Sequence, residues 1–103
     1  MTKVELYRAG KTIYRVVVSG HALFDEYGHD IVCAGISTVV TGILNALEEL
    51  TPYNTSQVVF RPGYVEIPHL TEDEKVQWTV QVFVIQLKTI AMKFPDYIEI
   101  LDL

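Results

Sequence analysis

The segment from residue 31 to residue 50 constrains the fold more than any other part of the chain. It carries no charge before Glu48 and Glu49, and its apolar residues recur at helical spacing. One line of apolar side chains on this predicted helix contains Val32, Ile36, Val39, Ile43, Leu47 and Leu50, and a second contains Cys33, Val40 and Leu44. Since apolar residues lie on more than one side, we expect a sheet plus a second helix, or a partner subunit, to cover this helix.

Two predicted β-hairpins lie on either side of that helix in the sequence. Residues 4–8 and 12–18 are rich in β-branched and aromatic side chains and flank a short turn that contains glycine. Residues 57–60 and 64–67 repeat this arrangement around a Pro-Gly pair, which is typical of a tight turn. We therefore expect one hairpin before the helix and one after it.

A second helix and a last strand complete the predicted order. Thr71 and Glu74 have the spacing of a capping box with Thr71 as N-cap, and apolar residues follow at steps of three and four. Pro95 ends this helix, and residues 97–101 form a strand. The order ββαββαβ predicts an α+β fold, with a mixed, mainly antiparallel sheet packed with two helices in one domain of residues 1–103.

Composition and charge exclude several classes of protein. Half of the residues are hydrophobic, which predicts a globular domain, and no apolar run approaches the ~20 residues of a membrane span. The single cysteine excludes an intrachain disulfide and suits a reducing compartment, and the N-terminal residues lack the core of a signal peptide. The net charge of −5 argues against direct binding to nucleic acid. We expect a cytoplasmic protein.

The residues that carry chemistry gather where a glycine-bounded loop meets the first helix. Asp30 precedes the apolar run and is the predicted N-cap, so Cys33 falls within the first turn. The unpaired N–H groups and the positive dipole end at that position stabilise a thiolate, the nucleophilic form of cysteine. His21 lies twelve residues upstream, and a loop of that length can bring its imidazole to the thiol as a general base. Ser37 lies one turn after Cys33, on the same helix face.

Two other interpretations of these residues remain open from the sequence. A lone cysteine is often a small buried hydrophobic residue, in which case Cys33 would be structural. His21, His29 and Cys33 are also suitable zinc ligands, and Asp30 or His69 would then have to complete the site. Their spacing matches none of the common zinc patterns, so no metal site is expected.

Residues 20–37 resemble the signature of the ribosomal-processing cysteine proteases, a bacterial family associated with Firmicutes and their relatives. The matching residues are Gly20-His21-Ala22, a short acidic loop, then Tyr27-Gly28-His29-Asp30-Ile31-Val32-Cys33-Ala34-Gly35, and Ser37. The resemblance implies a cysteine endopeptidase that removes the N-terminal extension of a large-subunit ribosomal protein. In that family a histidine and a cysteine at these positions form the catalytic dyad, and here those roles fall on His21 and Cys33.

The resemblance has further implications for this chain. Asp30 and Ser37 are candidates for supporting the dyad, and the loop with Phe24, Tyr27 and Gly28 is expected to close over the peptide substrate. The expected partners are the extended ribosomal protein precursor and a second copy of the chain as a homodimer, and no cofactor is expected. The competing hypothesis is a non-catalytic, ribosome-associated binding module with a buried structural cysteine. Reactivity of the folded protein toward a thiol reagent distinguishes the two.

Overall fold

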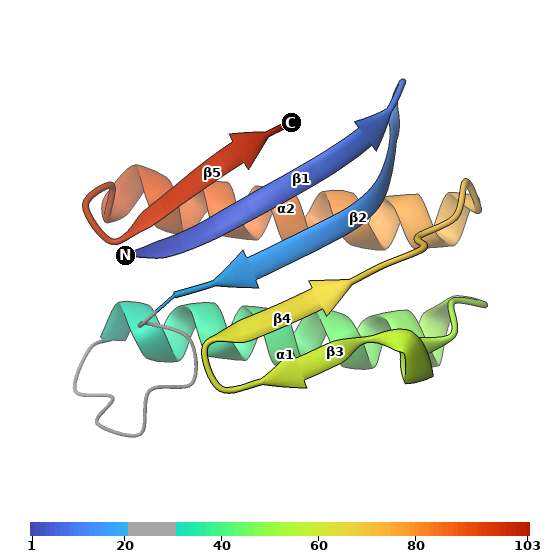
Figure 1. Ribbon diagram of the computed structural model, residues 1–103, viewed down its shortest axis with the longest axis horizontal. Coiled ribbons are helices and arrows are strands. Elements are labelled where there is room, and N and C mark those ends of the chain that lie inside the picture. The colour runs from blue at the N-terminus through green and yellow to red at the C-terminus, as the bar shows by residue number, and fades with distance from the viewer. Residues whose placement is uncertain (21–30) are drawn as a thin grey trace.

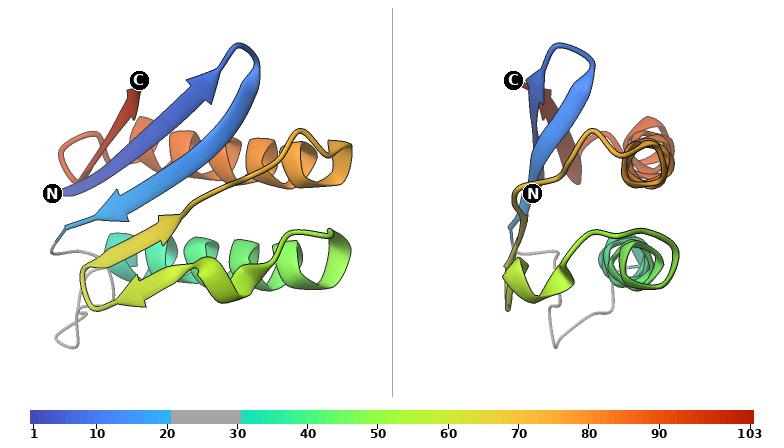
Figure 2. Two further views of the ribbon diagram at one scale, coloured as in Figure 1. Left: turned by 45° about the vertical axis from the view of Figure 1, so that its right-hand side comes forward. Right: turned by 90° about the vertical axis from the view of Figure 1, so that its right-hand side faces the viewer.

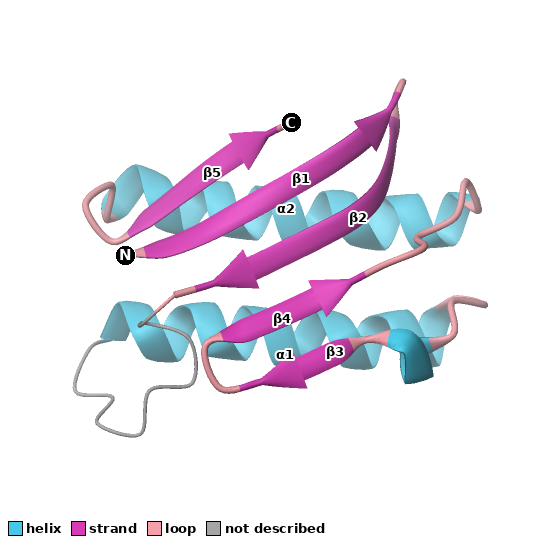
Figure 3. Ribbon diagram, viewed as in Figure 1, coloured by secondary structure: helices cyan, strands magenta, loops and turns pink. Residues whose placement is uncertain are grey.

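The computed structural model describes residues 1–20 and 31–103, which form five strands and two long helices (Figures 1 and 3). The elements are β1 (Thr2–Ala9), β2 (Thr12–Ser19), α1 (Ile31–Leu50), β3 (Val59–Arg61), β4 (Tyr64–Ile67), α2 (Glu74–Lys93) and β5 (Ile98–Asp102). A short 3-10 turn, Thr55–Gln57, precedes β3. The predicted order ββαββαβ and the α+β class are confirmed.

The strands form one mixed sheet in the order β3-β4-β2-β1-β5. The pairs β1–β2, β2–β4 and β3–β4 are antiparallel, whereas β5 pairs with β1 in parallel, with Thr2 opposite Ile98. A parallel neighbour requires a crossover connection, and α2 supplies it. The sheet is therefore mixed and mainly antiparallel, as predicted.

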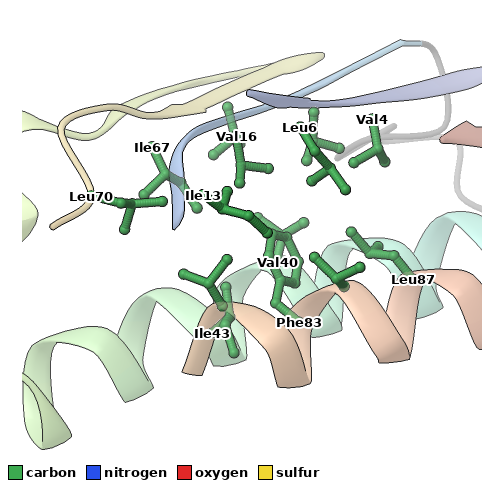
Figure 4. Packing of buried hydrophobic residues seen from close by; sticks show 14 of the residues in the cluster. Val4, Leu6, Ile13, Val16, Val40, Ile43, Ile67, Leu70, Phe83 and Leu87 are labelled. Atoms are coloured by element: carbon green, nitrogen blue, oxygen red, sulfur yellow. The ribbon is translucent and has the colours of Figure 1, made fainter. Parts of the chain in front are cut away.

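Both helices cover the same face of the sheet, so the fold has two layers (Figure 2). The core lies between these layers, where Val4, Leu6 and Val16 of the sheet point toward the helices (Figure 4). The helices contribute Val40, Phe83 and Leu87 among others, and all six of these side chains are almost completely buried. Alternate residues of the strands reach the core, as the two-residue period of a β-strand requires.

Helix α1 is covered by the sheet on one side and by α2 on another, which is one of the two arrangements expected from its two apolar lines. Val39 and Leu44 are partly buried against the core. By length and composition alone α1 is also long and apolar enough to cross a membrane. It nevertheless supplies six buried side chains to the domain, as a core helix does.

Two predicted boundaries differ from the structure. Thr71 is not the N-cap of α2, because Asp73 holds that position and its carboxylate accepts hydrogen bonds from the N–H groups of Lys75 and Val76, at 2.9 and 3.1 Å. A carboxylate at the positive end of a helix is favoured over a hydroxyl two residues earlier. In the second hairpin β3 begins at Val59 rather than at residue 57, because the 3-10 turn takes up the preceding residues.

Candidate active site

Gly20 joins the end of β2 to the loop that precedes α1. Its φ of +134° lies in a region that favours glycine, and its N–H donates a 3.0 Å hydrogen bond to the carbonyl of Gly63 in the β3–β4 turn. A Cβ on Gly20 would overlap the carbonyl oxygen of Met1 and lie 2.9 Å from Cα of Thr2. Only glycine lets three backbone segments meet at this point, from which the chain continues directly into His21.

Cys33 is the third residue of α1, within its first turn, where the sequence predicted it. Its side chain is buried, at only 6% exposed. The first four N–H groups of an α-helix have no acceptor within the helix, and those of Cys33 and Ala34 are among them. A sulfur at this position lies in a positive local field, which favours the thiolate.

The face of α1 that follows Cys33 is built from small residues. Ser37 lies one turn further on and is partly exposed, and it lines a shallow hollow of about 430 Å³ with Thr38, Thr41, Gly42 and Asn45. No described heavy atom outside the helix lies within 4 Å of the position that a Cβ on Gly35 would take. Among the described residues, the face of α1 that continues from Cys33 is thus lined by small side chains around a shallow hollow.

Several candidate residues named from the sequence lie outside the described part of the chain, namely His21, Phe24, Tyr27, Gly28, His29 and Asp30. The structure places the residues on either side of them. Gly20 and the start of α1 lie at the same end of the molecule, beside the N-terminus of β1 and the β3–β4 turn (Figure 1). The described residues on either side of the segment that carries His21 thus lie at the same end of the molecule as Cys33.

Sequence reasoning missed two features of this end of the molecule. The β3–β4 turn borders Gly20, and the guanidinium of Arg61 lies 4.3 Å from the ring centroid of Tyr64 in a cation–π contact. Thr2 is completely buried, and its hydroxyl has no hydrogen-bond partner among the residues that the structure describes. No local pattern could have placed these residues here, because the β2–β4 and β1–β5 pairings that do so join residues far apart in the sequence.

A metal site is not formed by the described residues, among which no three His, Cys, Asp or Glu side chains gather. His69 is exposed in the loop between β4 and α2, which lies at the opposite end of the molecule from the start of α1. His69 therefore cannot complete a ligand set with Cys33, which removes one of the two ways in which the zinc alternative could close.

Relatives and solved structures match this chain over nearly its whole length. It is 31% identical over 96 residues to a ribosomal processing cysteine protease Prp of Bacillus subtilis, covering 87% of this chain and 86% of that protein. A Staphylococcus aureus protein of the same name is 34% identical over 91 residues, covering 82% of each chain. The crystal structure of S. aureus Prp with a covalently linked product peptide superposes with a TM-score of 0.89 at 29% identity, with 100% of both chains covered. The crystal structure of SMU.848 from Streptococcus mutans superposes with a TM-score of 0.80 at 32% identity, with 100% of this chain and 94% of that chain covered.

A cysteine in the first turn of a helix, on a scaffold shared with a protease–peptide complex, defines a cysteine peptidase. The family model described as cysteine protease Prp matches residues 1–99. The chain belongs to this family, as the resemblance of residues 20–37 predicted. Family membership favours the peptidase over the non-catalytic binding module.

Proposed function

We propose that this protein is a ribosomal-processing endopeptidase in which Cys33 is the nucleophile and His21 is the general base. The observation that carries the proposal is the position of Cys33 in the first turn of α1, on a fold shared with a cysteine protease that holds a covalently linked product peptide. Gly20 supports the assignment of His21, because the end of β2 from which His21 follows lies at the same end of the fold as Cys33.

The proposed reaction has two stages. The imidazole of His21 takes the thiol proton, the Cys33 thiolate attacks the carbonyl carbon of the scissile peptide bond, and the C–N bond breaks as His21 returns the proton to the leaving amine. Water then attacks the carbonyl carbon of the thioester and gives a proton to His21. The C–S bond breaks, the N-terminal fragment leaves as a carboxylic acid, and His21 returns the proton to the sulfur of Cys33. The covalently linked product peptide on the S. aureus relative agrees with such a covalent intermediate.

Backbone groups at the start of α1 supply the remaining electrostatic help. The N–H groups of Cys33 and Ala34, in the first turn of α1, are assigned to the developing oxyanion, because the positive end of the helix dipole favours negative charge there. Asp30 and Ser37 are assigned supporting roles, Asp30 as the helix N-cap and Ser37 from its place one turn beyond the thiol. These side-chain and backbone groups complete the reaction without a cofactor or a metal ion.

The proposed substrate is the N-terminal extension of a large-subunit ribosomal protein. It follows from the curated relatives, which are named as ribosomal processing proteases, and from the S. aureus structure with a substrate peptide. The loop that contains Phe24, Tyr27 and Gly28 is the proposed substrate contact.

Residues 1–103 act as one domain, and the site of action is the cytoplasm, where ribosomal proteins are made. We also propose that the active form is a homodimer.

Cleavage of the extended ribosomal protein of the same organism tests this function. The purified protein is incubated with that precursor, and the mass of the precursor is followed over time. Wild type should shorten it by one discrete N-terminal peptide, whereas Cys33→Ala and His21→Ala should leave it intact. His69→Ala is the matched control, because His69 is exposed at the other end of the molecule, and it should cleave normally.

The pH dependence of alkylation separates the roles of the two residues. A catalytic Cys33 should react with iodoacetamide in the folded protein, with an apparent pKa below that of an ordinary thiol, about 8.5. His21→Ala should remove the low-pH part of this reactivity. An intact precursor together with a Cys33 that is alkylated only after unfolding would refute the peptidase assignment. Cleavage that survives Cys33→Ala would mean that another residue is the nucleophile.

A further inference from the structure

A hollow of about 270 Å³ lies between the first β-hairpin and α2. Its walls come from β1, from the turn of the hairpin, from β2 and from α2. This turn projects beyond α2, at the opposite end of β2 from Gly20 (Figure 2). Because β2 has eight residues, the two ends of the strand lie roughly 25 Å apart. The hollow is therefore separate from the candidate active site.

Arg8 enters the hollow where the hydrophobic core ends. Val4 and Leu6 point toward the helices, and Arg8 follows them at the two-residue period of β1. Its Nε donates a 2.6 Å hydrogen bond to the carboxylate of Asp102 in β5. The two terminal nitrogens of the guanidinium make no hydrogen bond to any residue that the structure describes. At this position the inner face of the sheet changes from apolar to charged.

Gln77 holds the walls of the hollow together. Its side-chain oxygen accepts a 3.0 Å hydrogen bond from the N–H of Ile13. Its side-chain nitrogen donates hydrogen bonds to the carbonyls of Ile13 and Thr71, at 2.9 and 2.7 Å. Both donors of this amide are thus used to fix β2 to α2. A ligand would enter a hollow whose walls are already in place, which lowers the entropic cost of binding.

The charged residues that line the hollow are all positive. They are Arg8, Lys11 and Lys88, and no acidic residue of the described part of the chain lines it. The whole chain has 13 acidic and eight basic residues, so these three gather against the overall balance. Asp102 offsets one of the three charges through its bond to Arg8 and leaves an excess of two. Like charges on separate elements repel each other, and a bound anion removes that repulsion.

The floor of the hollow is apolar. Ile13 and Val84 are buried there, at 2% and 6% exposed, whereas Ile85 is 63% exposed at its side. Gln81 adds an exposed amide to the lining. Sites for small organic molecules combine such an apolar surface with a few polar groups, and the hollow lies near the lower end of their usual range of roughly 300–1,000 Å³. The lining therefore fits a small ligand with an anionic part and an apolar part.

The excess of two positive charges selects a phosphate as the anionic part. A phosphate group carries about 1.5–2 negative charges at neutral pH, whereas a carboxylate carries one. The fork of the Arg8 guanidinium and the lysine ammonium groups both suit phosphate oxygens. An aliphatic floor suits the flat ring of a nucleobase better than a sugar, whose hydroxyl groups would lose their hydrogen bonds to water.

We propose that the hollow between the first hairpin and α2 binds a nucleoside phosphate. The phosphate contacts Arg8, Lys11 and Lys88. The base lies against the apolar floor beside Ile85. This binding site goes beyond the peptidase function and does not depend on it.

Titration followed by heteronuclear NMR tests this site. The probes are ADP, GDP, inorganic phosphate and a short single-stranded RNA. The nucleotides should shift the backbone amide signals of Arg8 and Lys11 and the side-chain amide signal of Gln81, and leave the backbone signal of Cys33 unchanged. Inorganic phosphate should shift the same signals but bind roughly tenfold more weakly, because it buries no apolar surface.

Three variants separate the parts of the site. The double variant Lys11→Gln/Lys88→Gln should weaken binding of nucleotides and phosphate roughly tenfold, because each exposed charge contributes a few-fold. Its matched control is Lys75→Gln/Lys93→Gln, which removes the same charge from exposed lysines of α2 that do not line the hollow, and which should bind normally. Ile85→Ser should weaken the nucleotides alone, because it alters only the apolar surface. These positions are exposed, so the variants should fold.

Each other outcome would overturn part of the proposal. No binding of any probe, or equal binding by the lining variant and its matched control, would overturn the site. Inorganic phosphate that binds as tightly as the nucleotides would overturn the contact with the base. RNA that binds more tightly than the nucleotides, with shifts of the same signals, would overturn the assignment to a small ligand in favour of nucleic acid. Precursor cleavage is not a readout of this experiment, so failure of the peptidase assignment would not affect it.

Discussion

Substitution of Gly20 by alanine should destabilise the domain far more than its small size suggests. A non-glycine residue held in a sparsely populated backbone region costs about 1–3 kcal/mol. In addition, the new Cβ would overlap the backbone of Met1 and Thr2, and such overpacking typically costs about 1–3 kcal/mol more. The expected loss is thus about 2–6 kcal/mol, out of the roughly 5–15 kcal/mol by which such domains are stable. For a domain of this size that corresponds to a fall in Tm on the order of 10–40 °C.

Gly10→Ala is the matched control for this substitution. Gly10 also has a positive φ, +62°, but no heavy atom of residues 1–20 or 31–103, apart from its chain neighbours, lies within 4 Å of its missing Cβ. It should therefore cost only the backbone strain, about 1–2 kcal/mol. Urea unfolding gives the free energy of unfolding of both variants. The difference between their losses is the cost of the overlap with the backbone at the start of β1. Precursor cleavage should fall for Gly20→Ala alone, because His21 follows this glycine. Equal losses of stability for the two variants would refute the claim that Gly20 is required by close backbone contact.

Three further predictions concern single positions. Gly35→Ala and Gly42→Ala should each stabilise α1 by up to about 1 kcal/mol, since neither Cβ would lie within 4 Å of a described heavy atom outside the helix. Only Gly35→Ala should also slow precursor cleavage, and equal cleavage by both would show that no substrate uses the space beside Cys33. Asp73→Ala should lower stability by about 1 kcal/mol in urea unfolding, because two N–H groups lose their acceptor. Thr71→Ala should have a much smaller effect, and the reverse ranking would restore the capping box. Burial raises the pKa of Tyr53 to about 12, so the stability gained from its neutral phenol is complete below pH 10 and is lost as the pH rises toward 12. Tyr53→Phe should flatten this alkaline loss, and an unchanged slope would contradict the assignment.

The secondary structure was predictable because local patterns determine most of it. The alternation in β1 and β2 and the long apolar periodicity of α1 are strong signals, and both gave the correct elements. The cap of α2 was assigned wrongly because Thr71, Asp73 and Glu74 all lie within one turn. Which of several capping residues is used depends on small differences in hydrogen bonding, and these do not appear in the residue spacing.

The arrangement of the strands and helices in space was harder to predict from the sequence than the secondary structure. A strand pattern at residues 97–101 predicts β5 but not that it lies parallel to β1, since that neighbour is chosen through the packing of α2. The position of Cys33 at a helix start could be predicted from the apolar run that begins at Ile31. The approach of the β3–β4 turn to Gly20 could not, because it depends on the register between β2 and β4.

The parallel pairing of β1 with β5 has a consequence for the synthesis of the chain. β1 takes its outer neighbour from β5, which is translated only after α2, with Thr2 opposite Ile98 and Leu6 opposite Asp102. Until β5 emerges from the ribosome, one side of β1 presents unpaired N–H and C=O groups that can template the pairing of another nascent chain. A ribosome that stalls within α2 therefore holds an open-edged intermediate prone to aggregation.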